Sequence, residues 1–87
     1  MKYELCWTPA AHRALRSIPQ HDALRLLMAL TLLGDDPYRR DGVDVKALTG
    51  RDGFRLRVGN YRLVYEVDDG KLIILVVTAG HRRDIYE

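Results

Sequence analysis

The chain has 87 residues, which is enough for one modest hydrophobic core but not for two, so residues 1–87 are expected to form a single domain. A composition with 47% hydrophobic and 30% charged residues excludes an intrinsically disordered chain. The formal net charge of +2 is too small to indicate any class of partner.

The first predicted elements are a strand and a short helix. Apolar and other residues alternate over residues 3–7, which predicts a strand. Thr8 and Pro9 then supply a hydroxyl N-cap and a proline at the first helical position. Apolar residues recur after Pro9 at helical spacings, so an amphipathic helix is expected to run to about Ser17, before Pro19 interrupts it.

Cys6, in the first predicted strand, is the only cysteine of the chain. A single cysteine excludes an internal disulfide and a cysteine-based zinc site. The lone thiol and the lack of a signal peptide predict a cytosolic protein. We expect no metal and no cofactor.

A second helix is predicted from about Asp22 to Leu33, with Gly34 as its C-terminal stop. Its apolar-rich run, residues 26–33, is far shorter than the roughly 20 residues that a membrane span needs. One interpretation buries this helix between the sheet and the first helix, and another leaves apolar surface for a partner chain. Both can hold, with Leu26, Leu30 and Leu33 as one stripe and Leu24, Leu27, Met28 and Leu32 around it.

Residues 34–53 form a polar connection that is long for a structureless loop, so a function or a short strand is expected within it. Three strands are then predicted, over residues 54–58, 61–67 and 72–79. The order β-α-α-β-β-β predicts an α+β fold, a largely antiparallel sheet of three to four strands with both helices packed on one face.

A two-residue turn at Gly59-Asn60 sets the register of the first hairpin and places Arg57 opposite Arg62. One face then carries Phe54, Leu56, Val58, Tyr61, Leu63 and Tyr65, and the other carries Arg55, Arg57, Arg62, Val64 and Glu66. If Asp69-Gly70 is also a two-residue turn, Val77 and Leu75 lie opposite Arg62 and Val64. Because like charges directly opposite each other destabilise a strand pair, the two arginines require an explanation.

Two explanations remain open for the arginines of this face. An ion-pair network with Glu66, or with an acid from the polar connection, would make them structural. Alternatively, a phosphate is the missing counterion, because the guanidinium group forms paired hydrogen bonds with phosphate oxygens. Arginine accounts for 11 of the 14 basic residues, but GC-rich coding bias would give the same excess.

The C-terminal segment GHRRDIYE adds further cations and a titratable group at the end of the last strand. An imidazole titrates near neutrality, and a phenol can stack on a base or donate a hydrogen bond. We therefore expect one patch suited to a phosphodiester, formed by Arg55, Arg57, Arg62, His81, Arg82 and Tyr86.

With these residues the chain strongly resembles the RelE/ParE superfamily of bacterial type II toxin–antitoxin toxins. The resemblance is carried by KALTGRDGFRLRVGNYRLVYEV (46–67) and VVTAGHRRDIY (76–86), and it covers nearly the whole chain. RelE-like toxins cleave mRNA in the ribosomal A site without a metal, through attack of the 2′-hydroxyl on the neighbouring phosphate. The superfamily also implies a cognate antitoxin, which we expect to bind Leu24, Leu27, Met28 and Leu32.

The resemblance implies specific roles for the cationic residues. We expect Arg62, His81, Arg82 and Tyr86 to be catalytic, and Arg55, Arg57, Arg83 and Lys46 to bind RNA. The chain departs from the RelE pattern at Arg55 and Arg57, where well-studied members have lysines and a lysine is the proposed general base. Arginine stays protonated and cannot take that role, so His81 is the candidate acid or base.

Alternative functions belong to other classes. A ParE-like toxin would inhibit DNA gyrase without nuclease chemistry, and a catalytically inactive domain would keep only the antitoxin contact. For His81, a structural role at the end of the strand is the alternative to proton transfer.

Overall fold

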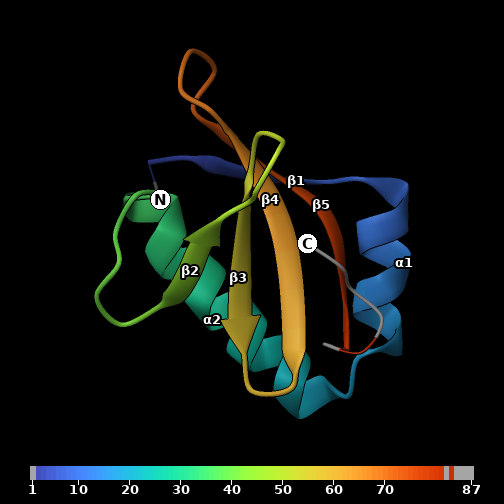
Figure 1. The fold of residues 1–87 in the computed structure, drawn as a ribbon. Helices are drawn as coiled ribbons and strands as arrows, with labels where there is room; N and C mark the ends of the chain where they lie inside the picture. The colour runs from blue at the N-terminus through green and yellow to red at the C-terminus, as the bar shows by residue number, and fades with distance from the viewer. Residues whose placement is uncertain (1, 82, 84–87) are drawn as a thin grey trace.

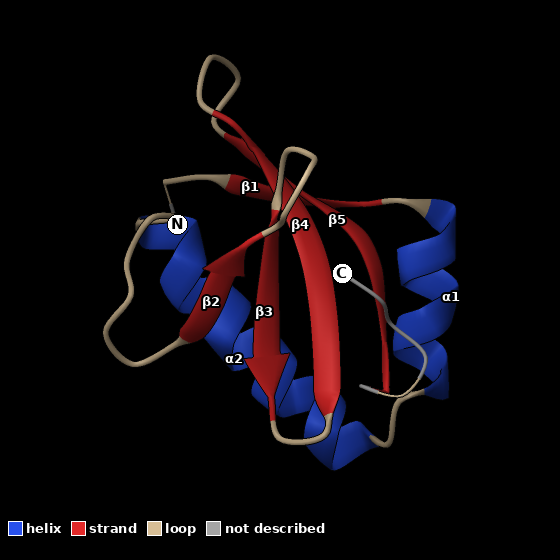
Figure 2. Cartoon of the chain, in the orientation of Figure 1, coloured by secondary structure: helices blue, strands red, loops and turns tan. Residues whose placement is uncertain are grey.

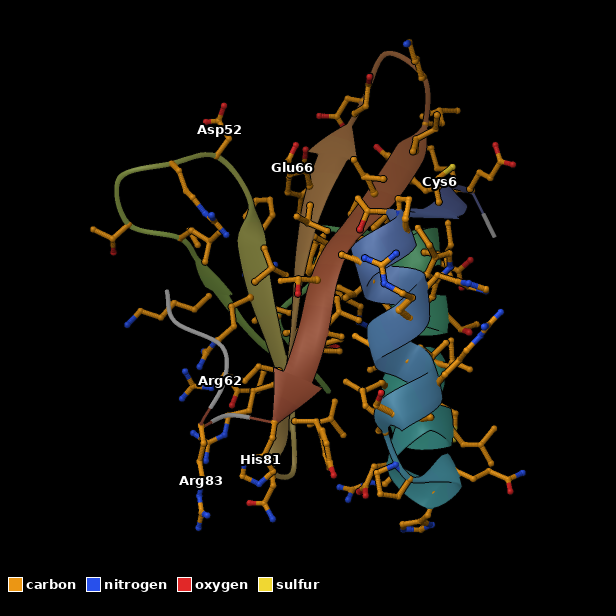
Figure 3. All side chains as sticks on the ribbon, turned by 90° about the vertical axis from the view of Figure 1, so that its right-hand side faces the viewer. Cys6, Asp52, Arg62, Glu66, His81 and Arg83 are labelled. Atoms are coloured by element: carbon orange, nitrogen blue, oxygen red, sulfur yellow. The ribbon has the colours of Figure 1, made fainter. Side chains whose placement is uncertain are left out.

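The computed structural model describes residues 2–81 and 83. Within these residues the chain forms two helices and five strands, and the strands form one sheet in the order β1-β5-β4-β3-β2 (Figure 1). Both helices lie on the same side of this sheet (Figures 1 and 3), which confirms the expected α+β fold. The elements are β1 (Glu4–Trp7), α1 (Pro9–Ser17), α2 (Gln20–Asp35), β2 (Asp44–Ala47), β3 (Phe54–Val58), β4 (Tyr61–Asp68) and β5 (Ile73–His81).

The sheet has five strands where three to four were predicted, because β2 adds a strand to the predicted β-α-α-β-β-β order. At one edge β1 pairs with β5 in parallel, from Glu4 opposite Ile73 to Trp7 opposite Val76. At the other edge β2 forms within the polar connection and pairs antiparallel with β3 (Figure 2). The prediction of a short strand in that connection is therefore confirmed.

The start of α1 follows the sequence signals, whereas α2 begins at Gln20 rather than at about Asp22 and ends beyond the predicted stop. The Thr8 hydroxyl accepts a hydrogen bond from the Ala11 N–H at 3.1 Å and caps α1, with Pro9 as the first helical residue. Helix α2 continues through Gly34 and ends at Asp35, so the predicted stop at Gly34 is wrong. The Gly34 carbonyl instead accepts a hydrogen bond from the Tyr3 N–H at 2.8 Å, which links α2 to the start of β1.

The core lies between the helices and the sheet. The predicted stripe of α2, Leu26, Leu30 and Leu33, is fully buried there. The sheet contributes Leu56 and Leu63, which lie opposite each other on β3 and β4 and are also fully buried. No helix within the described part of the chain is long and apolar enough to cross a membrane.

The β4–β5 register differs from the prediction. Four residues, 69–72, connect the strands instead of two, and the Asp68 carboxylate accepts a hydrogen bond from the Lys71 N–H at 3.0 Å within this connection. The pairing also shifts between Val64 and Tyr65. As a result, Gly80 and Thr78 lie opposite Arg62 and Val64, where the two-residue turn placed Val77 and Leu75.

Asp69 joins three distant parts of the chain at this connection. Its two carboxylate oxygens accept hydrogen bonds from the hydroxyls of Tyr3 and Tyr38, each at 2.6 Å. The hydrogen bond from Tyr3, followed by the one from Tyr38, lowers the pKa of Asp69. The same bond to Asp69 is the main reason that the pKa of Tyr3 rises to about 12. The ionised carboxylate and the neutral phenols are thus the stabilising forms.

We expect Asp69→Asn to lower the melting temperature at pH 7. The folded pKa of Asp69 is depressed, so its contribution is present above the ordinary carboxyl pKa of about 4 and is lost as the pH falls below it. The folded pKa of Tyr3 is raised, so its contribution is present below about pH 10 and is lost as the pH rises toward 12. Thermal melts of both proteins from pH 2 to 8 test the acid limb, and equal melting temperatures at pH 7 would contradict the prediction.

Candidate functional site

The opposed arginines are present as predicted. Arg57 and Arg62 are direct cross-strand partners on β3 and β4, and both side chains are half-buried. Gly59, in the turn between the strands, has a φ of 60°, a conformation that glycine adopts readily. The turn therefore holds two guanidinium groups side by side on the face away from the helices, which is called the open face below.

Arg55 lies on the same face, but it is buried, with 8% of its surface exposed. Its Nη2 atom lies 3.3 Å from Oδ1 of Asp44 on β2, which gives an ion pair across the two strands. An acid from the polar connection thus pairs with Arg55, one arginine of this face, which is the kind of contact that the ion-pair explanation required. Sequence analysis missed Asp44, although the alternation of exposed Asp44, half-buried Val45 and exposed Lys46 is a strand signal.

Lys46 and Asp44 extend the open face onto β2. Lys46 lies opposite Arg55 in the β2–β3 ladder, and Asp44 lies opposite Arg57. Asp44 thus places a carboxylate beside the cations at this end of the open face.

Glu66 is too far along β4 to neutralise Arg62 directly. The two residues are four apart in one strand, which corresponds to roughly 13 Å. Figure 3 shows Glu66 toward one end of the sheet and Arg62 toward the other. The open face is therefore divided, with its cations gathered at one end.

His81 ends β5 at the same end of the sheet as Arg57 and Arg62, but on the other face, so the expected single patch is not formed by all of these residues. It lies opposite Tyr61 on β4, which packs against the core on the helix side, and the two rings make an edge-to-face contact at 5.5 Å between centroids. Figure 3 shows Arg62, His81 and Arg83 at the same end of the sheet. The cross-strand partner of Arg62 on β5 is Gly80, so the neighbouring position on β5 carries no side chain.

The Nδ1 atom of His81 accepts a hydrogen bond from the Arg83 N–H at 3.2 Å. In neutral His81 this bond places the lone pair on Nδ1 and the proton on Nε2.

The remaining predicted site residues fall into two groups. Arg82 and Tyr86 lie outside the described residues. On α2, Leu24, Met28 and Leu32 are 51%, 69% and 40% exposed, whereas Leu27 is partly buried against the core. The structure thus supports both interpretations of this helix, a buried stripe and an exposed apolar surface. Among residues 2–81 and 83, no group of side chains has the composition of a metal site.

Comparisons with known proteins agree with this architecture. The model of the family described as the ParE toxin of the type II toxin–antitoxin system, parDE, matches residues 5–86. The chain therefore belongs to this family, within the RelE/ParE superfamily of toxins.

Individual relatives match this chain over most of its length. Toxin RelG of Mycobacterium tuberculosis is 30% identical, with 99% of this chain and 98% of RelG covered. RelE in the archaeal RelE–RelB complex from Pyrococcus horikoshii is 28% identical with a TM-score of 0.82, over 98% of this chain and all of that chain. The Escherichia coli RelBE complex gives 26% identity and a TM-score of 0.76, over 91% of this chain and 95% of that chain.

The opposed pair predicts a salt-dependent stability. Replacing Arg57 with Gln removes one of two like charges and should leave the stability unchanged or raise it by about 0.2–1 kcal/mol in low salt. The gain should shrink as salt screens the repulsion. Urea unfolding of the variant and the parent protein at low and high salt measures this, and a clear loss of stability would show that Arg57 is a structural ion-pair partner.

Proposed function

We propose that this chain is a toxin that cleaves mRNA on the ribosome without a metal, and that a cognate antitoxin blocks it. The observation that carries the proposal is the Arg57–Arg62 pair on the open face. Guanidinium groups form charge-assisted and often bidentate hydrogen bonds with phosphate oxygens. The relatives named above as RelE and RelG, two of them in complexes with RelB, support the same reading.

The chemistry is attack of the 2′-oxygen on the adjacent phosphorus. A base removes the 2′-hydroxyl proton, the O2′–P bond forms, the P–O5′ bond breaks, and an acid protonates the leaving O5′. Arg62 and Arg82 are proposed to stabilise the negative charge of the phosphorane. His81 is proposed to move a proton through Nδ1 after releasing the Arg83 amide, and Tyr86 to orient the ribose.

The other cations are proposed to hold the RNA backbone. Arg57, Lys46 and Arg83 expose enough of their side chains to contact phosphate oxygens. Arg55 is buried and paired with Asp44, so its contribution is to the electrostatic potential of the site rather than a direct contact. The exposed apolar residues of α2 are proposed to bind the antitoxin together with Leu27.

Inhibition of DNA gyrase is the second candidate function. It is favoured by the ParE description of the family and by arginine at positions 55 and 57, since arginine cannot act as a general base.

A paired assay separates these functions. Purified toxin should cut mRNA on programmed ribosomes and leave fragments with a 5′-hydroxyl, while gyrase supercoiling continues at its normal rate. Inhibited gyrase with intact mRNA would replace the nuclease proposal with the ParE-like one. Activity in neither assay would leave a domain that only binds its antitoxin.

In cells that express the toxin alone, we expect Arg62→Ala to relieve growth arrest. The variant loses a phosphate-binding cation from the open face but keeps the core. Arg51→Ala is the matched control, because Arg51 is an exposed arginine of the β2–β3 connection. Growth arrest by the Arg62 variant at equal expression would remove this residue from the proposed site.

We expect His81→Gln to reduce cleavage by about two to four powers of ten, the usual contribution of a general acid or base, while ribosome affinity is kept. Single-turnover cleavage by the variant and by the parent protein measures this effect. Full activity of the variant would assign His81 a structural role.

A further inference from the structure

A groove of about 640 Å³ lies between α2 and the end of β3. It lies beside the start of β2. Asp44, the first residue of β2, pairs with Arg57, and β3 continues beyond this pair to Val58. Aliphatic side chains dominate its lining, including Met28, Leu32, Val43, Leu56 and Val58.

The α2 wall of this groove is exposed apolar surface. Met28 and Leu32 lie one helical turn apart, and they are 69% and 40% exposed. Aliphatic surface of this extent next to a groove is typical of a protein-binding site.

The lining also selects the kind of occupant. Among the described residues that line the groove, none is aromatic, so it offers no platform on which a nucleic-acid base could stack. Its charged residues are Arg25 and Arg57, and the Arg57 side chain lies on the open face, so Arg25 is the lining residue that favours an anion within the groove. Aliphatic walls with one guanidinium group at the rim fit a peptide segment that carries apolar side chains and a carboxylate.

Arg25 connects this groove to the open face. Its Nη1 atom lies 3.3 Å from the position that a Cβ atom on Gly59 would occupy, so the guanidinium packs over the β3–β4 turn. The strands that meet at this turn carry Arg57 and Arg62. A carboxylate bound to Arg25 therefore alters the electrostatic potential around Arg57 and Arg62.

We propose that the groove binds an aliphatic segment of the antitoxin through a carboxylate on Arg25, and that this contact weakens RNA binding on the open face. The inference rests on the proposed function, since it assigns the antitoxin to this groove and RNA to the open face. By linkage, the coupling is reciprocal, so bound RNA weakens the antitoxin contact by the same factor. The antitoxin thus lowers RNA affinity from a surface that the RNA does not occupy.

Four variants of the full chain test the proposal. Leu32→Gln and Arg25→Gln alter the groove. Leu72→Gln is the matched apolar control, since Leu72 is also 40% exposed but lies in the β4–β5 connection. Arg13→Gln is the matched charge control, from the exposed side of α1. For each variant, the Kd is measured for the purified antitoxin and, separately, for a short fluorescent single-stranded RNA.

Leu32→Gln should weaken antitoxin binding about tenfold and leave RNA binding unchanged, because it removes only apolar burial. Arg25→Gln should weaken both antitoxin and RNA binding about two- to fivefold in low salt, and should make antitoxin binding less sensitive to salt. The two control variants should bind both ligands like the parent protein. Met28→Gln repeats the apolar test if Leu32→Gln melts at a lower temperature.

Parental antitoxin affinity in both Leu32→Gln and Met28→Gln would overturn the groove as the docking site. Unchanged antitoxin affinity and salt dependence in Arg25→Gln would overturn the carboxylate contact, and unchanged RNA affinity in that variant would overturn the coupling. Failure of the proposed nuclease function would look different. The parent protein would then bind neither RNA nor programmed ribosomes, while the antitoxin affinities would still decide the groove.

Discussion

The turn at Gly59-Asn60 holds β3 and β4 in one register, and most of the molecule depends on that register. With Leu56 opposite Leu63 in the core, the alternation of side chains requires Arg57 to face Arg62 on the other side of the sheet. A slip by one residue would bury the arginines and expose the leucines, so the core itself enforces the unfavourable cationic pair. The hydrophobic core thus fixes the positions of two neighbouring arginines on the open face.

The division of the open face follows from where single residues enter the sheet. β2 adds Lys46 and Asp44 beside the arginines, and β5 adds Gly80, which has no side chain, opposite Arg62. Glu66 stands toward the opposite end (Figure 3). An elongated anion therefore meets a gradient of charge along the strands, which favours one position and one orientation over others.

Family membership leaves the chemistry to individual side chains. A fold shared by toxins named ParE, RelE and RelG can host different activities, because activity resides in the site and not in the scaffold. In this chain Arg55 is buried against Asp44. An arginine cannot act as a general base, which is why the proposed mechanism assigns proton transfer to the imidazole of His81.

The amino-acid sequence by itself determined the features that depend on residues close together in the chain. These were the start of α1 at Thr8, the buried stripe of α2, the β3–β4 register and the opposed arginines. Only the tertiary structure decided the contacts between distant segments, such as the parallel pairing of β1 with β5. Just after β1, the Thr8 hydroxyl donates a hydrogen bond to the carbonyl of Val77, which is 69 positions away in the sequence. The β4–β5 register was also not predicted. Its connection has four residues instead of two, with the Lys71 N–H bonded to the Asp68 carboxylate, and the strand pairing shifts between Val64 and Tyr65. The Arg55–Asp44 ion pair belongs to the same class: its partners lie on separate strands, and neither residue carries a local signal of the other.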